Sequence, residues 1–171
     1  MNKDIYFIGG IHGVGKGTIC KEIVKTHDVN HITASELLRW DEISSLGNKK
    51  VANIQNTQDR LLRAIMALPS CNYLLDGHFC LLNKDNIPKK IPIETFLAIN
   101  PKVISVVTSD IGTIYDRIKQ RDECNYEKMT LKLMQEMEIE YALEISHKLN
   151  VPFIEIKNDN PINLTKTLPK R

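Results

Sequence analysis

The stretch "FIGGIHGVGKGT", residues 7–18, starts at the end of the apolar run Ile5–Ile8. It holds five glycines and one lysine. Each glycine in regular structure costs about 0.5 to 1 kcal/mol relative to alanine, so this density of glycine needs a reason. Glycines between a strand and a helix let backbone N–H groups turn toward one point, where they meet the positive end of the helix dipole. The stretch therefore predicts a strand, an anion-binding turn and a helix in direct succession.

The spacing of these residues satisfies the GxxxxGK part of the phosphate-loop, or Walker A, pattern. Lys16 would then bridge the β- and γ-phosphates of a nucleotide as a point charge. One departure is that Gly17 stands where the pattern has a hydroxyl, and Thr18 follows one place later. The nucleotide-binding residues predicted from this stretch are Gly10, His12, Gly13, Val14, Gly15, Lys16, Gly17 and Thr18.

Composition narrows the class of protein. A chain of 171 residues with 42% apolar and 26% charged residues is typical of one ordinary globular core. The net charge of +2 does not favour direct nucleic-acid binding. The four cysteines form no CxxC pair, so their spacing indicates neither a zinc site nor a disulfide framework. With no apolar run of about 18 residues, we expect no membrane insertion and a cytoplasmic location.

Short apolar runs alternate with helical patterns along the chain, which is typical of a parallel sheet covered on both faces. The strands are expected at Ile5–Ile8, His31–Thr33, Tyr73–Leu75, Val103–Val107 and Phe153–Ile156. The helices are expected at Lys16–Thr26, Ser35–Leu46, Asn56–Leu68, Ile93–Ile99, Ile111–Arg121 and Lys128–Leu149. In the last helix an apolar stripe from Met134 to Leu149 is expected to pack on the sheet. Residues 83–92, with two prolines and three lysines, are expected to form a surface loop.

The pattern GxxGxGKGT resembles the phosphate loop of adenylate kinases and related nucleoside monophosphate kinases. That family usually has proline where this chain has His12, which either fills the turn or donates a hydrogen bond to a phosphate when protonated. The stretch "HITASELLR", residues 31–39, resembles the family's second strand and the start of its monophosphate-binding region. The resemblance implies that Thr33 lies at the acceptor site and that Arg39 holds the acceptor phosphate, although an exposed helix charge is the alternative for Arg39. Ser35 is a candidate helix N-cap.

The stretch "YLLDGH", residues 73–78, delivers Asp76 at the carboxyl end of a buried strand, the edge where ligands bind in open α/β sheets. Asp76 is well placed for magnesium. Typical adenylate kinases continue with a run whose arginine holds the monophosphate, and this chain has His78, Phe79 and Cys80 instead. The Asp-x-His motif at this place resembles that of archaeal-type adenylate kinases and of adenylate-kinase-like ATPases associated with ribosome maturation. This resemblance implies an active-site role for His78. A buried histidine with its hydrogen bonds satisfied is the alternative.

The stretch "SDIGTIYDRIKQRDE", residues 109–123, places Arg117 and Arg121 four residues apart on one side of an apolar helix stripe. This RxxxR resembles the start of the family's lid, which implies contacts from both arginines to the nucleotide. The alternative is a solvated helix end with weak ion pairs.

The resemblance implies a P-loop NTPase fold, a three-layer sandwich with a five-stranded parallel sheet and helices on both faces. It also implies one P-loop kinase domain over residues 1–171, with a monophosphate-binding region at 34–70 and a short lid at 117–128. ATP and Mg²⁺ are the implied cofactors, with Thr18 and Asp76 as metal ligands. The implied catalytic residues are Lys16, Asp76, Arg117 and Arg121.

The leading functional hypothesis is transfer of the γ-phosphate of ATP to a nucleoside monophosphate, with AMP as the family's default acceptor. An anionic acceptor needs no general base, and Arg39 favours this hypothesis. One alternative is a slow ATPase that acts as a switch or assembly factor with a protein or ribonucleoprotein partner. Another is a kinase for a nucleoside or metabolite hydroxyl, in which Asp76 or His78 accepts the proton.

Overall fold

The computed structural model describes residues 3–38, 54–83, 85, 87–121, 126–157 and 159–171. Five strands form one parallel sheet in the order β2-β3-β1-β6-β7. The strands are β1 (Ile5–Gly9), β2 (Asn30–Thr33), β3 (Tyr73–Asp76), β6 (Val103–Thr108) and β7 (Phe153–Lys157). Each predicted strand is therefore confirmed, and each differs from its prediction by one residue at one end.

Helices connect these strands. They are α1 (Lys16–Ile23), α2 (Ala34–Leu38), α4 (Ile54–Ala67), α5 (Ile93–Ile99), α6 (Ile111–Arg121), α7 (Lys128–Leu149) and α8 (Ile162–Thr165). The predicted bounds of α5, α6 and α7 are confirmed. Asn100 and Asn150 end α5 and α7 in the left-handed conformation, which asparagine tolerates better than most residues. Of the helix expected at Ser35–Leu46, the part beyond Leu38 lies outside the described residues.

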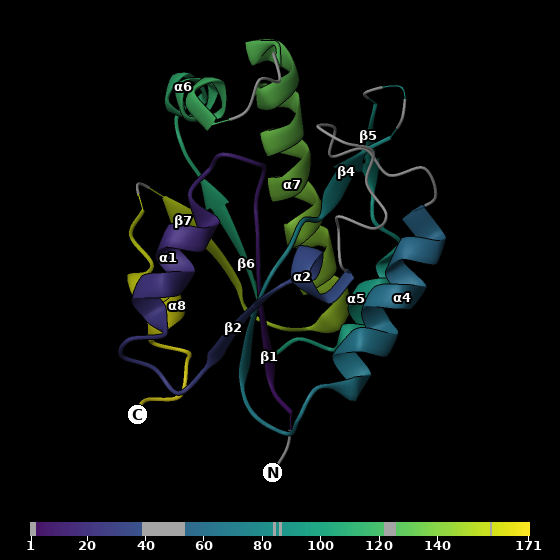
Figure 1. Ribbon diagram of the computed structural model, residues 1–171, viewed down its shortest axis with the longest axis vertical. Coiled ribbons are helices and arrows are strands. Elements are labelled where there is room, and N and C mark those ends of the chain that lie inside the picture. Colours follow the sequence, from purple (N-terminus) through teal and green to yellow (C-terminus); the bar gives the residue numbers. More distant parts are fainter. Residues whose placement is uncertain (1–2, 39–53, 84, 86, 122–125, 158) are drawn as a thin grey trace.

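The helices cover both faces of the sheet, because successive side chains of a strand point to opposite faces. Tyr6 and Ile8 of β1 belong to one buried cluster, together with residues of α1, α6 and α8. Ile5 and Phe7 belong to a second cluster, which α4, α5 and α7 complete. In Figure 1, α1 and α8 lie to the left of the sheet and α4 and α5 to its right. The predicted three-layer P-loop fold is confirmed.

Three aromatic rings pack together in the second cluster, beside the first residues of the glycine-rich stretch. The rings of Phe7, Phe79 and Phe96 lie within 5.0 to 5.5 Å of one another, centroid to centroid. Burying a Phe side chain contributes about 1.5 to 3 kcal/mol. The Phe79 ring covers Gly9 so closely that a Cβ at that position would overlap the ring. Glycine at position 9 therefore permits this aromatic packing.

The segment 83–92 differs from its prediction as a surface loop. The strands β4 (Cys80–Leu82) and β5 (Pro88–Lys90) pair antiparallel as a hairpin beside the main sheet. Proline is tolerated as the first residue of β5, where no ladder hydrogen bond from its nitrogen is needed. Tyr141 of α7 then donates a hydrogen bond to the Ile91 carbonyl at 2.6 Å. This contact fastens the end of the hairpin to α7, and local composition does not reveal it.

No helix in the described parts of the chain combines the length and the apolar character needed to cross a membrane.

Candidate functional site at the phosphate-binding loop

The turn between β1 and α1 depends on glycine at three positions. Gly10, Gly13 and Gly15 have φ angles of 142°, 80° and 107°, a region that side-chain-bearing residues avoid. A Cβ on Gly10 would lie 2.7 Å from the Val107 carbonyl oxygen, and one on Gly13 would lie 2.6 Å from a carbon of Ile118. The turn therefore lies against β6 and α6 in a conformation that only glycine adopts without strain.

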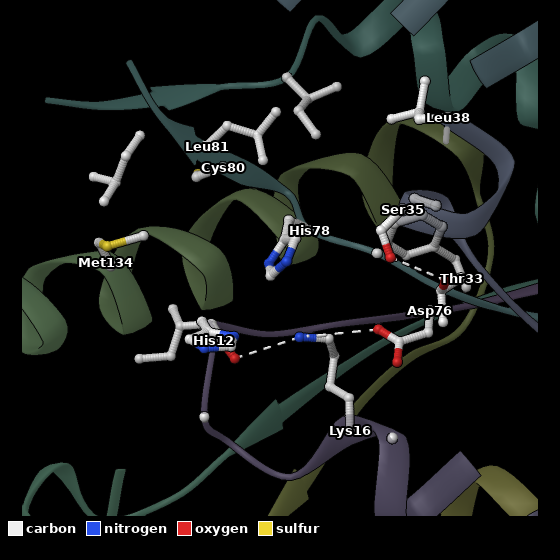
Figure 2. Close-up of a pocket in the computed structure, with 18 of the residues that line it drawn as sticks. His12, Lys16, Thr33, Ser35, Leu38, Asp76, His78, Cys80, Leu81 and Met134 are labelled. Carbon is white, nitrogen blue, oxygen red and sulfur yellow. Dashed lines mark hydrogen bonds and ion pairs between the residues drawn. The ribbon is translucent and has the colours of Figure 1, made fainter. Parts of the chain in front are cut away.

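Lys16 opens α1 and extends its side chain back inside the turn. Its ammonium donates hydrogen bonds to the carbonyl oxygens of Gly10 at 2.6 Å and Ile11 at 3.3 Å. The same nitrogen lies 3.9 Å from Asp76 Oδ1, as Figure 2 shows. Helix α1 begins at this residue, so the positive end of its dipole lies at the turn. The dipole and the Lys16 ammonium therefore both contribute positive charge there.

Asp76 ends β3 in the middle of the sheet edge. It pairs in register with Ile8 of β1 on one side and Thr33 of β2 on the other. Its two carboxylate oxygens face different partners, since Oδ1 is directed toward Lys16 and Oδ2 lies 3.6 Å from Nε2 of His31. A carboxylate at the carboxyl end of a central strand lies where ligands bind in open α/β sheets.

Arg117 of α6 contacts the outer side of the turn. Its Nη1 donates a hydrogen bond to the Val14 carbonyl at 3.1 Å, and its Nη2 lies 3.4 Å from Asp159. The Val14 side chain is fully buried, and Arg117 contacts only the backbone carbonyl of this residue in the hydrogen bond described. Arg121, one helical turn further on, lines the cavity described next, whereas Arg117 does not. The two arginines thus approach the turn from different positions.

One cavity of about 640 Å³ connects the turn with the region that follows β2 and with α4. A volume of this size is typical of a small-molecule site. Of the residues predicted from the sequence, those that line it are His12, Gly13, Gly15, Lys16, Gly17, Thr18, Thr33, Asp76, His78 and Arg121. Figure 2 shows His12, Lys16, Thr33, Asp76 and His78 grouped around this space. Gly10 and Val14 contribute to the turn without lining the cavity.

The start of α2 corrects one detail of the sequence analysis. The Thr33 hydroxyl accepts a hydrogen bond from the Glu36 amide at 3.0 Å, and the Glu36 carboxylate accepts one from the Thr33 amide at 2.9 Å. This reciprocal pair is a capping box, so Thr33 is the N-cap and the prediction of Ser35 was wrong. Ser35 instead lies within hydrogen-bond distance of the Thr33 hydroxyl, at 3.0 Å.

Two predicted features fall partly or wholly outside the described residues. Arg39 lies outside them, so its role at the acceptor site stays a prediction. The proposed lid at 117–128 is described only at its ends, where α6 finishes at Arg121 and α7 begins at Lys128.

Glu138 is a buried residue near the loop that the sequence analysis missed. Its Oε1 accepts hydrogen bonds from the amides of Phe79 and Cys80 at 2.9 and 2.8 Å. Burial raises the pKa of this carboxyl to about 7, while the Cys80 amide and the Lys16 ammonium limit the rise. A signal was present, because Glu138 lies four residues after Met134 and three before Tyr141, on the apolar stripe of α7.

Gln58 of α4 is a second buried polar residue on the cavity wall. The residue is 2% exposed, and its Oε1 has no hydrogen-bond partner among the described residues. An unpaired buried amide oxygen costs about 1 to 3 kcal/mol unless something binds to it. Gln58 is therefore a candidate ligand contact on the wall that α4 contributes to the cavity.

The comparisons with known proteins agree with this geometry. The family model described as an AAA domain matches residues 9–134. The mitochondrial GTP:AMP phosphotransferase of Drosophila melanogaster is 30% identical over 124 residues, which cover 66% of this chain and 53% of that protein. This chain thus matches about half the length of that relative.

The fold and the glycine-rich turn define the class, which is that of P-loop proteins with a phosphate-binding loop between a strand and a helix. Within that class the chain belongs to the AAA domain family, and this family match together with the similarity to the phosphotransferase supports an adenylate-kinase-like relationship. The resemblance inferred from the sequence is confirmed at this level.

Proposed function

We propose that this protein is a nucleotide kinase that transfers the γ-phosphate of ATP to a nucleoside monophosphate, with AMP as the first acceptor to test. The observation that carries the proposal is that one cavity is lined by Lys16 of the phosphate-binding loop and also by Thr33 at the end of β2 and Gln58 of α4. Phosphoryl transfer needs a donor and an acceptor aligned in one enclosed space, with positive charge at the transferred group.

The donor end of this cavity is built around Lys16. Its ammonium lies inside the turn and would contact the phosphates of the donor, where it offsets negative charge that develops during transfer. Arg121, on the cavity wall, would add a second positive charge. Arg117 is proposed to hold the turn in shape through the Val14 carbonyl.

Thr18 in the first turn of α1 and Asp76 at the end of β3 would also suit a magnesium ion. Thr18 and Asp76 both line the cavity and supply a hydroxyl and a carboxylate oxygen, the type of ligand that magnesium prefers. When bound, the ion would neutralise charge on the triphosphate. Asp76 would thereby serve both the ion and Lys16.

The acceptor end is assigned to Thr33, His78 and Arg39. A monophosphate brings an anionic oxygen that attacks without a general base, so its phosphate needs cations rather than a proton acceptor. Gln58 would accept a hydrogen bond from the acceptor's base or ribose, which would satisfy its unpaired Oε1. The name of the Drosophila relative, a GTP:AMP phosphotransferase, supports AMP as acceptor and makes GTP the second donor to test.

An adenylate-kinase-like ATPase that works as a switch or assembly factor is the second candidate. The observation that favours it is His78, which lines the cavity where typical adenylate kinases have an arginine for the monophosphate. Asp76 and His78 would then position a water molecule, and a protein or ribonucleoprotein partner would receive the signal. For a hydroxyl acceptor, the third candidate function, either Asp76 or His78 would accept the proton.

A coupled assay separates these functions. ATP and GTP are each supplied with magnesium and with AMP, CMP, UMP, GMP or no acceptor, and formation of the diphosphate is measured beside free phosphate. Transfer that depends on one monophosphate supports the kinase, whereas hydrolysis that no acceptor stimulates supports the ATPase. Arg39→Ala should raise the acceptor's KM only in a kinase. Unchanged acceptor kinetics in that variant would contradict the acceptor-site assignment.

A further inference from the structure

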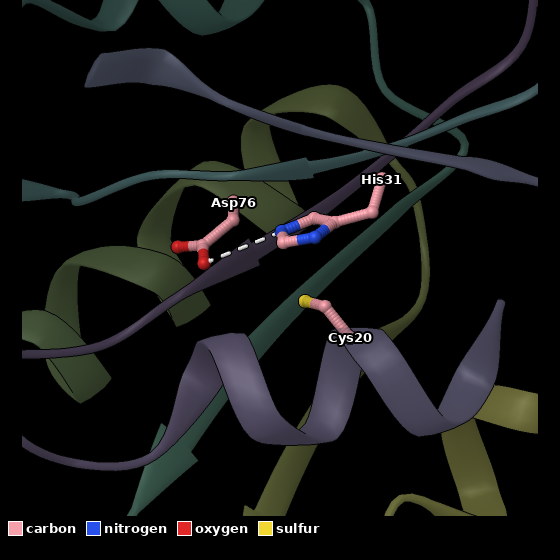
Figure 3. A group of neighbouring side chains, drawn as sticks. All are labelled: Cys20, His31 and Asp76. Atoms are coloured by element: carbon pink, nitrogen blue, oxygen red, sulfur yellow. Dashed lines mark ion pairs between the residues drawn. The ribbon is translucent and has the colours of Figure 1, made fainter. Parts of the chain in front are cut away.

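Three side chains with metal-binding atoms meet beside the phosphate-binding loop. They are Cys20 of α1, His31 of β2 and Asp76 of β3, as Figure 3 shows. One sulfur, one imidazole nitrogen and one carboxylate oxygen from these residues all lie within 4.8 Å of one another. No other group of three or more such ligands occurs within the described ranges.

His31 supplies an independent indication that a ligand belongs here. Its Nε2 is buried and has no hydrogen-bond partner in the described part of the chain. Asp76 Oδ2 is 3.6 Å away, which is too far for a good hydrogen bond. A buried ring nitrogen without a partner costs free energy that a bound cation would recover.

The donor set selects the kind of cation. Thiolate, imidazole and carboxylate together are typical of zinc, while magnesium and calcium prefer oxygen ligands alone. Zinc bonds of about 2.0 to 2.3 Å in tetrahedral geometry place ligand atoms about 3.4 to 3.7 Å apart. Because the present separations are at most 4.8 Å, movements of about 1 Å would bring the three atoms to these distances.

The charges of the ligand set also suit a divalent cation. Asp76 directs Oδ1 toward Lys16 and Oδ2 toward His31, so binding through Oδ2 leaves the contact with Lys16 in place. On binding, the Cys20 thiol would release its proton to solvent, and the thiolate would add a negative charge to that of the Asp76 carboxylate beside the cation and the Lys16 ammonium. The Cys20 side chain is fully buried, which shields a metal–thiolate bond from solvent.

We propose that Cys20, His31 and Asp76 form a binding site for zinc or a cation of the same class, with the fourth position filled by water. The site lies outside the residues assigned to nucleotide binding except for Asp76. If Asp76 also serves magnesium, zinc bound here competes with the magnesium–nucleotide complex and inhibits transfer, and this consequence rests on the proposed function.

Cobalt titration of the purified, reduced protein without nucleotide tests the site directly. Cobalt replaces zinc in such sites and reports its ligands by colour. We expect one equivalent to bind with strong visible absorption of four-coordinate cobalt and near-ultraviolet absorption from a thiolate–cobalt bond. Added zinc should displace the cobalt and abolish both signals. Weak six-coordinate absorption without the thiolate signal would overturn the proposal.

Two substitutions assign the ligands. Cys20→Ala should remove the thiolate signal, and His31→Gln should keep it but weaken cobalt binding by about tenfold or more. Cys80→Ala is the matched control, because Cys80 is also buried but does not belong to the cluster, and it should leave the titration unchanged. Equal binding by wild type and Cys20→Ala would show metal held elsewhere and would overturn the proposal.

A stability measurement covers the case in which a variant folds poorly. Zinc at concentrations well above its dissociation constant should raise the Tm of the wild type and of Cys80→Ala, because binding to the folded state stabilises it. The Tm of His31→Gln, which keeps Cys20, should respond much less. An equal rise in all three would contradict the site. Since none of these measurements uses nucleotide, a failed kinase assay leaves them unaffected.

Discussion

The carboxylate of Glu138 on α7 accepts a hydrogen bond from the Cys80 amide at 2.8 Å, across a sequence separation of 58 residues. A second bond, from the Phe79 amide, reaches the same oxygen. These two bonds hold the chain directly after His78 against α7. The carboxylate also lies close enough to Lys16 for the ammonium to lower its pKa. Glu138 thus connects the packing of α7 to the phosphate-binding loop.

Glu138 gives the protein a pH-dependent stability. Burial raises the pKa of the folded-state carboxyl from 4.5 to about 7, so the unfolded chain loses its proton first as the pH rises. Its contribution to stability is therefore greatest below pH 4.5, falls between pH 4.5 and about 7, and is constant above. At about 1.4 kcal/mol per pKa unit the fall is on the order of 3 kcal/mol.

Glu138→Gln should remove this dependence. Glutamine keeps an oxygen for the Phe79 and Cys80 amides but does not titrate. We expect the free energy of unfolding of the variant to change less than that of wild type across this pH range, as measured by urea denaturation. Glu140→Gln, at an exposed position on the same helix, should follow the wild type. Parallel curves for wild type and Glu138→Gln would contradict the raised pKa.

Lys16→Ala should abolish either transfer or hydrolysis. The ammonium supplies the positive charge inside the turn, and loss of such a group typically lowers kcat about a hundredfold or more. Lys25→Ala is the control, because Lys25 is exposed just beyond α1 and pairs only with Glu22 among the described residues. Activity that survives in Lys16→Ala, with circular dichroism showing a folded protein, would exclude the loop as the reaction site.

The glycines of the turn should differ sharply in their tolerance of alanine. Gly10→Ala forces a left-handed φ on alanine and directs its methyl group at the Val107 carbonyl, so we expect a loss of about 1 to 3 kcal/mol in stability. Gly17→Ala meets no atom within 4 Å and replaces a helical glycine, so we expect a gain of up to about 1 kcal/mol. Urea denaturation measures both, and equal effects would contradict the turn geometry.

Gln58→Leu should affect the acceptor and spare the donor. Leucine fills a similar volume but offers no oxygen to a ligand, and one lost hydrogen bond corresponds to a rise in KM of about three- to tenfold. We expect this rise for the acceptor monophosphate, an unchanged KM for the donor, and little change in Tm. Gln120→Leu, exposed on α6 away from the cavity lining, is the control. A rise in the donor KM instead would move Gln58 to the other end of the cavity.

Arg121→Ala should slow transfer without loss of stability. The side chain is exposed and lines the cavity, so its removal costs little packing but takes away a positive charge near the proposed donor. A fall in kcat of about a hundredfold is expected. Arg63→Ala changes an exposed arginine of α4 outside the cavity and should have no effect on either quantity. An unaltered kcat in Arg121→Ala would show that this arginine has no role in the reaction.

The sequence alone predicted the elements whose cause is local. The phosphate-binding turn follows from the left-handed φ angles of Gly10, Gly13 and Gly15, which the glycine spacing indicates directly. The five strands and the bounds of α5, α6 and α7 follow from apolar periodicity, which reports the buried face of each element. The place of Asp76 at the carboxyl end of β3 was also predicted, because a buried apolar run leads directly to it.

Tertiary structure decided the contacts between elements far apart in the chain. Glu138 meets the Cys80 amide, Gln58 faces the cavity, and Cys20, His31 and Asp76 converge only because α1, β2, β3, α4 and α7 pack around one sheet. In the same way, the end of the β4–β5 hairpin meets Tyr141 of α7 through a contact between distant parts of the chain. A sequence pattern records which face of a helix or strand is buried. Which other side chain a buried residue contacts depends on the strand order and on how the helices pack. Both are properties of the whole fold.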